Sequence, residues 1–139
     1  MSIATRVVDE PSQDEVQRLV HRLVAWNSSV APPEDHRKLA VFAYDAHELA
    51  GGAAGYTHWG WLFVSHLWVA DELRGEGLGS RLMSEIESAA VRRGAEMAHL
   101  DTYDFQALRF YERLGYEQFA ELHDYPPGHS RHFLKKRLA

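Results

Sequence analysis

The spacing of hydrophobic residues in the first part of the chain predicts one amphipathic helix. Between residues 12 and 27, apolar side chains recur every three or four positions and so share one helix face; they are Val16, Leu19, Val20, Leu23 and Val24. Ser12 and Glu15 have the spacing of a capping box, which places the helix start at Ser12. The helix is expected to end near residues 26–27. A short strand is expected before it, over residues 4–8.

From residue 38 onward the pattern alternates between strands and helices. Aromatic and β-branched residues with little charge predict strands over 39–44, 49–59 and 61–69, and the short turns between them favour an antiparallel meander. Apolar residues at steps of four predict a helix that begins at Leu78 and ends at Gly94. The remaining expected elements are a strand over 96–102, a short helix over 107–114, and strands over 116–122 and 132–138.

This element order predicts the α/β fold class, with a mixed, mostly antiparallel sheet flanked by helices. The helix that begins at Leu78 joins the central strand, 61–69, to the next strand, and such a connection is expected to be a right-handed crossover between parallel strands. A chain of 139 residues is the size of one domain, so residues 1–139 are expected to form a single domain.

The composition of the chain argues against several kinds of function. Lys and Arg number 15 against 20 Asp and Glu, a net charge of −5, whereas generic nucleic-acid binders are usually basic. The absence of cysteine excludes disulfides, zinc–thiolate sites and a cysteine nucleophile. No stretch reaches the roughly 18 apolar residues of a membrane span, and the N-terminus lacks the apolar run of a signal peptide. We therefore expect a cytoplasmic protein without a nucleic-acid or membrane partner.

A glycine-rich segment after the central strand carries the clearest chemical pattern. Arg74, Gly75, Gly77 and Gly79 lie between that strand and the following helix. The first turn of a helix has unpaired N–H groups and a partial positive charge, and glycines let a large anion approach them, which predicts phosphate binding. No lysine follows as in a P-loop, and the glycine spacing differs from the dinucleotide fingerprint.

These residues carry a family resemblance. Arg74-Gly-Glu-Gly77-Leu-Gly79 resembles the Arg/Gln-x-x-Gly-x-Gly/Ala motif of the GNAT superfamily of acyl-CoA-dependent N-acetyltransferases. Ala107-x-x-Phe110-Tyr111-Glu-Arg-Leu-Gly115-Tyr116 is similar to the second motif of that family, and the tail resembles a branch of small bacterial single-domain members. The resemblance implies the GNAT fold and transfer of an acetyl group from acetyl-CoA, as cosubstrate, to a primary amine of a small molecule, by direct attack in a ternary complex.

The resemblance also implies which residues bind the cofactor. The main chain of the central strand would pair with the pantetheine arm, the glycine segment would bind the pyrophosphate through its backbone amides, and the second motif would add two contacts. In sequence order these residues are Leu67, Trp68, Val69, Arg74, Gly75, Glu76, Gly77, Leu78, Gly79, Ser80, Ala107 and Tyr111.

The resemblance implies only some of the catalytic residues. Tyr111 stands where the family often has the tyrosine that protonates the leaving thiolate. Where relatives have an acidic residue or histidine as general base, this chain has Phe63 and Ser65, which are not strong bases. His66 is adjacent but would point to the opposite face of a regular strand, unless a bulge reverses it. Asp101 acting through water, and a water relay without a fixed base, stay open. The oxyanion donor is expected to be a backbone N–H near Val69.

Two alternatives remain: a non-catalytic acyl-CoA-binding or sensing module, and a nucleotide-dependent transferase. A metal site is not expected, because the closest histidine pair, His129 and His132, would face opposite sides of a strand. Exposed strand edges would permit a homodimer. Aromatic and acidic residues could line a pocket for the amine, although ordinary packing explains most of them; they are Trp59, Trp61, Trp68, Tyr103, Tyr125, Asp101 and Asp104.

Overall fold

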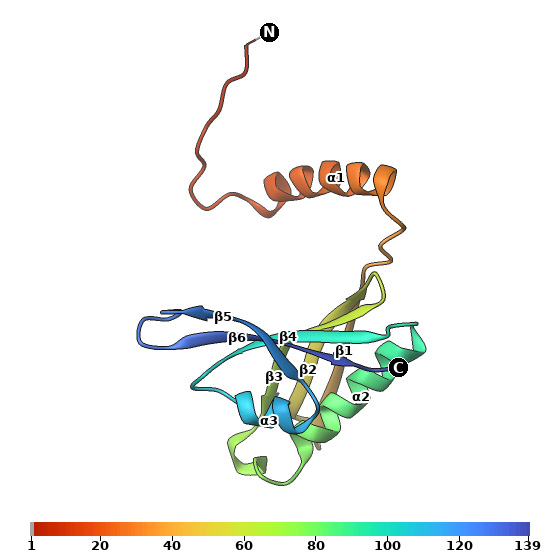
Figure 1. Ribbon diagram of the computed structural model, residues 1–139, viewed down its shortest axis with the longest axis vertical. Coiled ribbons are helices and arrows are strands. Elements are labelled where there is room, and N and C mark those ends of the chain that lie inside the picture. The colour runs from red at the N-terminus through yellow and green to blue at the C-terminus, as the bar shows by residue number, and fades with distance from the viewer. Residues whose placement is uncertain (1) are drawn as a thin grey trace. The chain divides into compact units, whose positions relative to one another are not determined.

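The computed structural model describes residues 2–139, and the chain divides into two compact units. The first unit ends at Glu34 and contains the helix α1 (Gln13–Val30); the second spans Asp35–Ala139 and contains the other elements (Figure 1). These are the strands β1 (Arg37–Asp45), β2 (Glu48–His58), β3 (Trp61–Val69), β4 (Met97–Tyr103), β5 (Glu117–His123) and β6 (Ser130–Arg137), the helices α2 (Leu78–Arg92) and α3 (Leu108–Arg113), and the 3-10 turn η1 (Asp71–Leu73). The single domain expected from the chain length stays a prediction.

The predicted capping box at the start of α1 is confirmed. The Glu15 amide donates to Ser12 Oγ at 3.1 Å, and the Ser12 amide donates to Glu15 Oε1 at 3.0 Å. The helix ends at Val30 and not near residues 26–27. Ala31 is extended because it precedes Pro32, and a residue before proline is disfavoured in a helix. The strand expected over residues 4–8 was wrong: this segment has no strand partner in the described chain.

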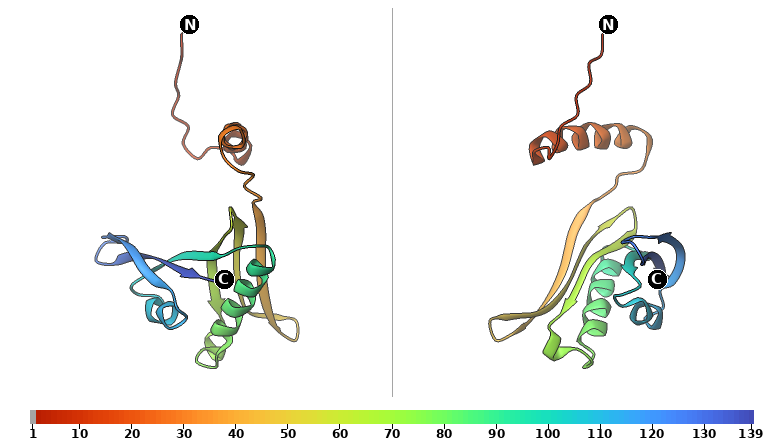
Figure 2. Two further views of the ribbon diagram at one scale, coloured as in Figure 1. Left: turned by 45° about the vertical axis from the view of Figure 1, so that its right-hand side comes forward. Right: turned by 90° about the vertical axis from the view of Figure 1, so that its left-hand side faces the viewer.

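The predicted sheet and its connections are confirmed. Six strands lie in the order β1-β2-β3-β4-β6-β5, and their ends differ from the predicted ends by at most two residues. The first three strands form the antiparallel meander, and β3 with β4 is the parallel pair that α2 connects. Figure 2 shows α2 lying along one face of this sheet, which we call the near face; the opposite face is the distal face.

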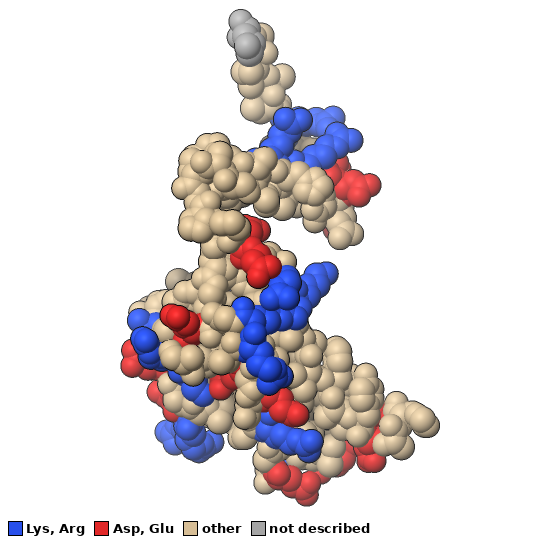
Figure 3. Space-filling view, turned by 90° about the vertical axis from the view of Figure 1, so that its right-hand side faces the viewer, with Lys and Arg blue, Asp and Glu red and all other residues tan. Residues whose placement is uncertain are grey.

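The core of the second unit lies between α2 and the near face. Leu82, Met83 and Ile86 of α2 are fully buried with Leu62 of β3 and Leu134 of β6. Because side chains alternate along a strand, the residues between these buried positions point to the distal face. Lys and Arg side chains lie interspersed with Asp and Glu on the face of this unit seen in Figure 3. None of the helices in residues 2–139 is both long and apolar enough to cross a bilayer.

A buried polar contact ties α2 to the last part of the sheet. Tyr116, which is 2% exposed, donates its hydroxyl proton to Glu87 Oε2 at 2.7 Å, and Lys136 Nζ donates to Glu87 Oε1 at 2.8 Å. Burial and the negative charge of Glu87 raise the pKa of Tyr116, so the phenol is neutral and remains a donor. The contact therefore links three separate segments of the chain.

Removing this hydroxyl should destabilise the fold. We expect Tyr116→Phe to lower the free energy of unfolding by about 1.5–3 kcal/mol, because a hydrogen bond to a charged acceptor is lost. Urea unfolding followed by circular dichroism measures the change. Tyr44→Phe is the matched control, because Tyr44 is 62% exposed on β1. Equal stability of the two variants would show that the Glu87 contact contributes nothing.

Candidate functional site

The two central strands are paired over a short stretch only. In the described residues, β3 pairs with β4 from Trp61–Met97 to Val64–Leu100 and no further. Both strands continue beyond this point, β3 to Val69 and β4 to Tyr103. The edge of β3 toward β4 therefore has backbone groups without a strand partner over Leu67, Trp68 and Val69, where pantetheine binding is predicted.

A β-bulge lies on β3 at the point where the pairing with β4 ends. Val64 is opposite Gly55, and His66 is opposite the adjacent residue Ala54, so Ser65 is the additional residue. Before the bulge Val64 is buried on the near face, and after it Leu67 packs against the same core. His66 therefore points to the distal face, as Phe63 does. Regular alternation predicted opposite faces for these two residues, and the one extra residue explains the difference.

The bulge also fixes the proton on the His66 ring. Ser65 Oγ donates its single proton to the Ala54 carbonyl oxygen at 3.1 Å. His66 Nδ1 lies 2.8 Å from the same Oγ, and with the Ser65 proton on the Ala54 carbonyl oxygen the ring nitrogen is the donor of this contact. In a neutral imidazole only one nitrogen carries a proton, so Nε2 is left with a free lone pair. An exposed nitrogen in this state can accept a proton from a ligand.

Asp101 is the first residue of β4 beyond the pairing with β3, and its side chain is held by Arg131. Arg131 Nη2 lies 2.7 Å and Nε 2.9 Å from Asp101 Oδ1. The two residues come from neighbouring strands, and both point to the distal face. Asp101 is therefore a fixed negative charge with a permanent partner, which leaves it less available as a base than His66.

Tyr111 lies on α3 and is 9% exposed, with its ring against those of Phe110 and Tyr116 at centroid distances of 5.1 and 6.1 Å. Burial and the negative charge of Asp101 raise the pKa of Tyr111 to about 12. The phenol is thus neutral at physiological pH and can donate its proton. The two residues predicted as catalytic, Asp101 and Tyr111, therefore interact electrostatically.

The glycine-rich segment forms an open loop before α2. Gly75 and Gly77 have φ angles of 83° and 87°, which favour glycine, and a Cβ at either position would have no neighbour within 4 Å. Arg74 folds back on the loop: Nε donates to the Val69 carbonyl oxygen at 3.2 Å, and Nη2 lies 3.1 Å from Asp71 Oδ1. Its side chain shapes the loop, and space next to the glycines remains free.

The start of α2 differs from that of α1. Gly77 is the N-cap, has no side chain to accept from the first amides, and is followed by no acidic residue in the first turn. The amides of Leu78, Gly79 and Ser80 therefore have no capping side chain. A Cβ at Gly79 would lie 3.3 Å from Phe110 Cζ, so the glycine lets α3 pack closely against this turn. Ala107 is the N-cap of α3 and accepts from the Tyr111 amide at 3.2 Å.

The predicted cluster of aromatic and acidic residues is only partly brought together. Tyr103 and Tyr125 line one shallow hollow at the end of β4, together with Phe105. Trp61 is the first residue of β3 and Trp59 lies in the turn before it, at the edge of the sheet where β4 begins. These two tryptophans are therefore remote from the hollow along the sheet.

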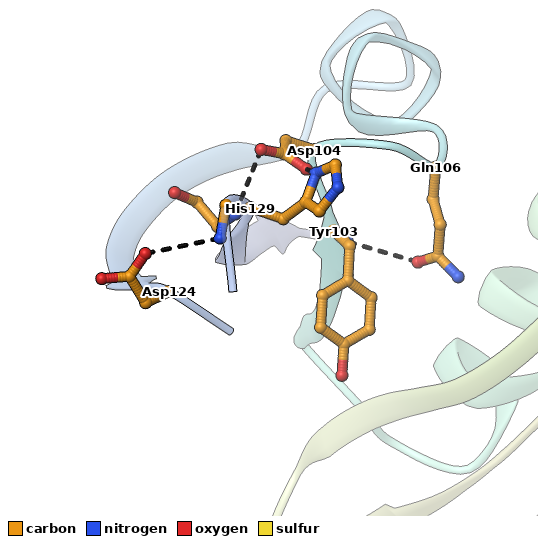
Figure 4. A network of polar contacts seen from close by, with 7 residues as sticks. Tyr103, Asp104, Gln106, Asp124 and His129 are labelled. Carbon is orange, nitrogen blue, oxygen red and sulfur yellow. Dashed lines mark hydrogen bonds and ion pairs between the residues drawn. The ribbon is translucent and has the colours of Figure 1, made fainter. Parts of the chain in front are cut away.

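Asp104 lies next to this hollow and holds the loop between β5 and β6. One oxygen is 2.8 Å from His129 Nδ1, and the other accepts from the Ser130 amide at 3.1 Å (Figure 4). These contacts lower the pKa of Asp104 although desolvation opposes the shift. The carboxylate anchors the loop, and its identity as Asp instead of Asn has this local explanation.

Two residues of the site were not predicted. His99 lies on the distal face of β4, with its ring 4.8 Å from that of Phe63, and burial lowers its pKa, against the effect of Asp101. Alternation with Asp101 could have identified it, because the two share a face. Arg131 could not be found in this way, because its contact with Asp101 depends on the pairing of β4 with β6.

Comparisons with known proteins place the chain in a family. Residues 5–116 match the model of the "Acetyltransferase (GNAT) family". The chain is 45% identical over 112 residues to blasticidin-S acetyltransferase of Streptomyces morookaense, covering 77% of this chain and 82% of that protein. It is 33% identical to an acetyltransferase of Agrobacterium fabrum, covering 95% of this chain and 98% of the relative.

A solved structure agrees with these matches. An acetyltransferase from Bacillus cereus has a TM-score of 0.85 with 28% identity, covering 96% of this chain and 98% of that one. The family model spans well over half of the chain, and each of these relatives is covered over more than two thirds of its length. The chain therefore belongs to the GNAT family of acetyltransferases and is an N-acetyltransferase.

Proposed function

We propose that the protein transfers an acetyl group from acetyl-CoA to a primary amine of a small molecule, by direct attack in a ternary complex. One observation carries this proposal: the uncapped start of α2 and the open glycine loop lie beside the end of β3 that is not paired with β4, with the neutral phenol of Tyr111 nearby. The helix start and the loop suit a diphosphate. The unpaired end of β3 leaves backbone groups free for an extended chain. Acetyl-CoA, when bound, supplies a thioester, so that an amide forms and a thiolate leaves.

The residues present fit this cosubstrate. Gly75 and Gly77 leave the loop backbone accessible, and the uncapped amides of α2 offer donors to the pyrophosphate, with those of residues 74–80 around them. The main chain of residues 67–69 would pair with pantetheine. On the α3 side, Ala107 and Tyr111 would complete the site. Most of these contacts use the backbone, so they depend on the loop conformation more than on side-chain identity.

Tyr111 is the proposed proton donor to the leaving sulfur. With a pKa of about 12 the phenol keeps its proton at any physiological pH, so it offers a hydrogen bond where negative charge develops on sulfur. On α3 the ring is buried, and the negative charge of Asp101 contributes to the raised pKa of its hydroxyl. Tyr111 is therefore in its protonated form, the form that a general acid needs, over the whole physiological pH range.

His66 is the proposed general base. An alkylammonium ion with a pKa near ~10 must lose a proton before it can attack. The lone pair on Nε2 of His66 can take that proton, because Ser65 keeps the other ring proton on Nδ1. Asp101 has a different proposed role: it holds the guanidinium of Arg131 in place, and the charges of the two side chains balance each other within this ion pair.

The acceptor is proposed from a relative. The similar protein from Streptomyces is a blasticidin-S acetyltransferase, so blasticidin S is the first acceptor to test. The proposed compartment is the cytoplasm, where acetyl-CoA is available. A homodimer stays a prediction.

Calorimetric titration with acetyl-CoA, against ATP and NAD as controls, tests the proposal. We expect binding of acetyl-CoA alone, followed by release of the CoA thiol when an accepted amine is added. Binding without thiol release over a broad amine panel would favour an acyl-CoA-binding module. Absence of binding would overturn the assignment of the glycine loop.

Changing Gly77 to alanine should weaken acetyl-CoA binding by about tenfold, because a Cβ in the left-handed conformation costs about 1–2 kcal/mol and the loop would change shape. Gly60→Ala is a matched control: Gly60 has a φ of 77°, no neighbour within 4 Å of a Cβ, and lies in the turn before β3. We expect Gly60→Ala to lower stability but not affinity. Equal affinities of the two variants would exclude a role for the loop in binding.

A further inference from the structure

A hollow of about 390 Å³ at the end of β4 and in the loop between β5 and β6 has no role in the chemistry described so far. Its lining consists of Tyr103, Phe105, Asp124, Tyr125 and Pro126. Phe105 and Tyr125 are 55% and 45% exposed, so these rings are not part of the core. A group of exposed rings at a fixed place needs an explanation other than packing.

The rings are arranged almost in parallel. Tyr103 and Phe105 have centroids 5.3 Å apart and an interplanar angle of 12°, and Tyr103 and Tyr125 have centroids 6.0 Å apart and an angle of 26°. Offset parallel rings present flat faces and edges with one orientation. Such a wall suits a flat ring better than a branched or saturated group.

The guanidinium of Arg131 holds the rings in place. The Arg131 guanidinium lies 5.0 Å from the centroid of the Tyr125 ring and 5.7 Å from that of Tyr103, and Nη1 donates to the Tyr125 hydroxyl at 3.0 Å. Asp101 fixes the same guanidinium. The rings are therefore ordered before any ligand binds, which reduces the entropy lost on binding.

The charge of the lining points to a cation. Asp124 is the one charged residue in the lining, and its described contact is a 3.5 Å bond from the Gly128 amide (Figure 4). The positive charge of Arg131 is matched by Asp101, so it does not offset Asp124. Aromatic faces also attract cations.

The hollow lies close to the proposed reacting groups. Tyr103 is two residues beyond Asp101 on the same strand and the same face, a separation of roughly 7 Å. A ring against Tyr103 would thus be a short chain away from an amine near Asp101 and His66. The distance sets the approximate length of a ligand that reaches both places.

We propose that this hollow binds a flat aromatic or heteroaromatic ring that carries positive charge or N–H donors, as the distal part of an amine acceptor. The amine of such a ligand is separated from the ring by a short chain. The acceptor role rests on the proposed function, whereas binding of the ring itself does not.

The test compares two probes in NMR titrations of the full chain. Benzamidinium is flat and cationic; cyclohexanecarboxamidinium has the same charge on a saturated ring. We expect benzamidinium to bind at least about fivefold more tightly and to shift the amide signals of residues 103–105, 124 and 125. Equal affinities of the two probes, or shifts elsewhere on the protein, would overturn the proposal.

Two variants locate the contacts. Tyr125→Leu should weaken benzamidinium binding by about tenfold, and Tyr44→Leu, a similar change at an exposed tyrosine of β1, should have no effect. Asp124→Asn should weaken benzamidinium binding but not that of neutral benzamide. If Tyr125→Leu and Tyr44→Leu behave alike, the ring binds outside the hollow and the proposal fails.

The outcome is independent of the proposed function. If acetyl-CoA binds and benzamidinium does not, the hollow has another role and the acetyltransferase assignment is unaffected. If benzamidinium binds and acetyl-CoA does not, the proposed function fails and the ring site stands. If both bind, 2-phenylethylamine should have a lower KM than 2-cyclohexylethylamine in the transfer assay; equal KM values would overturn the acceptor role of the hollow.

Discussion

Replacing Tyr111 with phenylalanine should lower kcat by about 10²–10⁴-fold and leave acetyl-CoA affinity unchanged, because the phenol is proposed to protonate the leaving thiolate. The ring stays in place against Phe110, so the loss reports the hydroxyl alone. The measurement is CoA thiol release with the best amine from a panel headed by blasticidin S. Calorimetry on the same variant supplies the affinity.

Tyr116→Phe is the matched control for this experiment. It removes a buried phenol hydroxyl five residues away that donates to Glu87, so it should lower stability without lowering kcat. The pH profile is a second check. Since the pKa of Tyr111 is raised to about 12 from 10, the rate should not fall as pH passes 10. Asp101→Asn should lower that pKa, because a charge that raises it is removed. An unchanged kcat in Tyr111→Phe would exclude the acid role.

His66→Ala should lower kcat by about 100-fold or more for amines that are protonated at neutral pH, because the group that removes the ammonium proton is lost. The loss should depend on the basicity of the acceptor. O-benzylhydroxylamine has nearly the shape of 2-phenylethylamine, but its amine is already neutral at pH 7. The variant should therefore acetylate O-benzylhydroxylamine at close to the wild-type rate and 2-phenylethylamine slowly.

The neighbouring residues separate a base from a structural histidine. Ser65→Ala removes the acceptor that keeps the proton on Nδ1, so it should reduce kcat for 2-phenylethylamine less than His66→Ala does, and Ser65→Thr should restore it. Asp101→Asn should reduce the rate for both amines to a similar extent. If His66→Ala slows both amines equally, the proton leaves by another route and a water relay becomes the better explanation.

The fold was largely predictable because burial determines it. In α2 the apolar residues at steps of four are the ones that pack on the near face, and in β3 the predicted and observed ends agree. The expected strand over residues 4–8 failed for a related reason: a short strand is stable only when another strand pairs with it. The sequence pattern of residues 4–8 does not indicate whether another strand pairs with them.

The site was less predictable because its contacts depend on register. The bulge at Ser65 moves His66 to the other face, and no hydrophobic pattern reports one additional residue. Gly55 was the available signal: a Cβ there would collide with the Phe63 carbonyl oxygen, and a glycine inside a strand often marks a bulge. The pairing of Asp101 with Arg131 joins strands distant in sequence, so no local rule could have given it.

The bulge on β3 determines which mutations at this place keep His66 on the distal face. Loss of the Ser65 codon would remove the bulge but keep every face: His66 would follow Val64 directly and still point to the distal face, and Leu67 and Val69 would still face α2. Straightening the strand with residue 65 retained would instead turn His66 toward α2 and Leu67 and Val69 outward into water. Selection should therefore act on the bulge conformation itself, and most strongly on Gly55, where a side chain would collide with the Phe63 carbonyl oxygen.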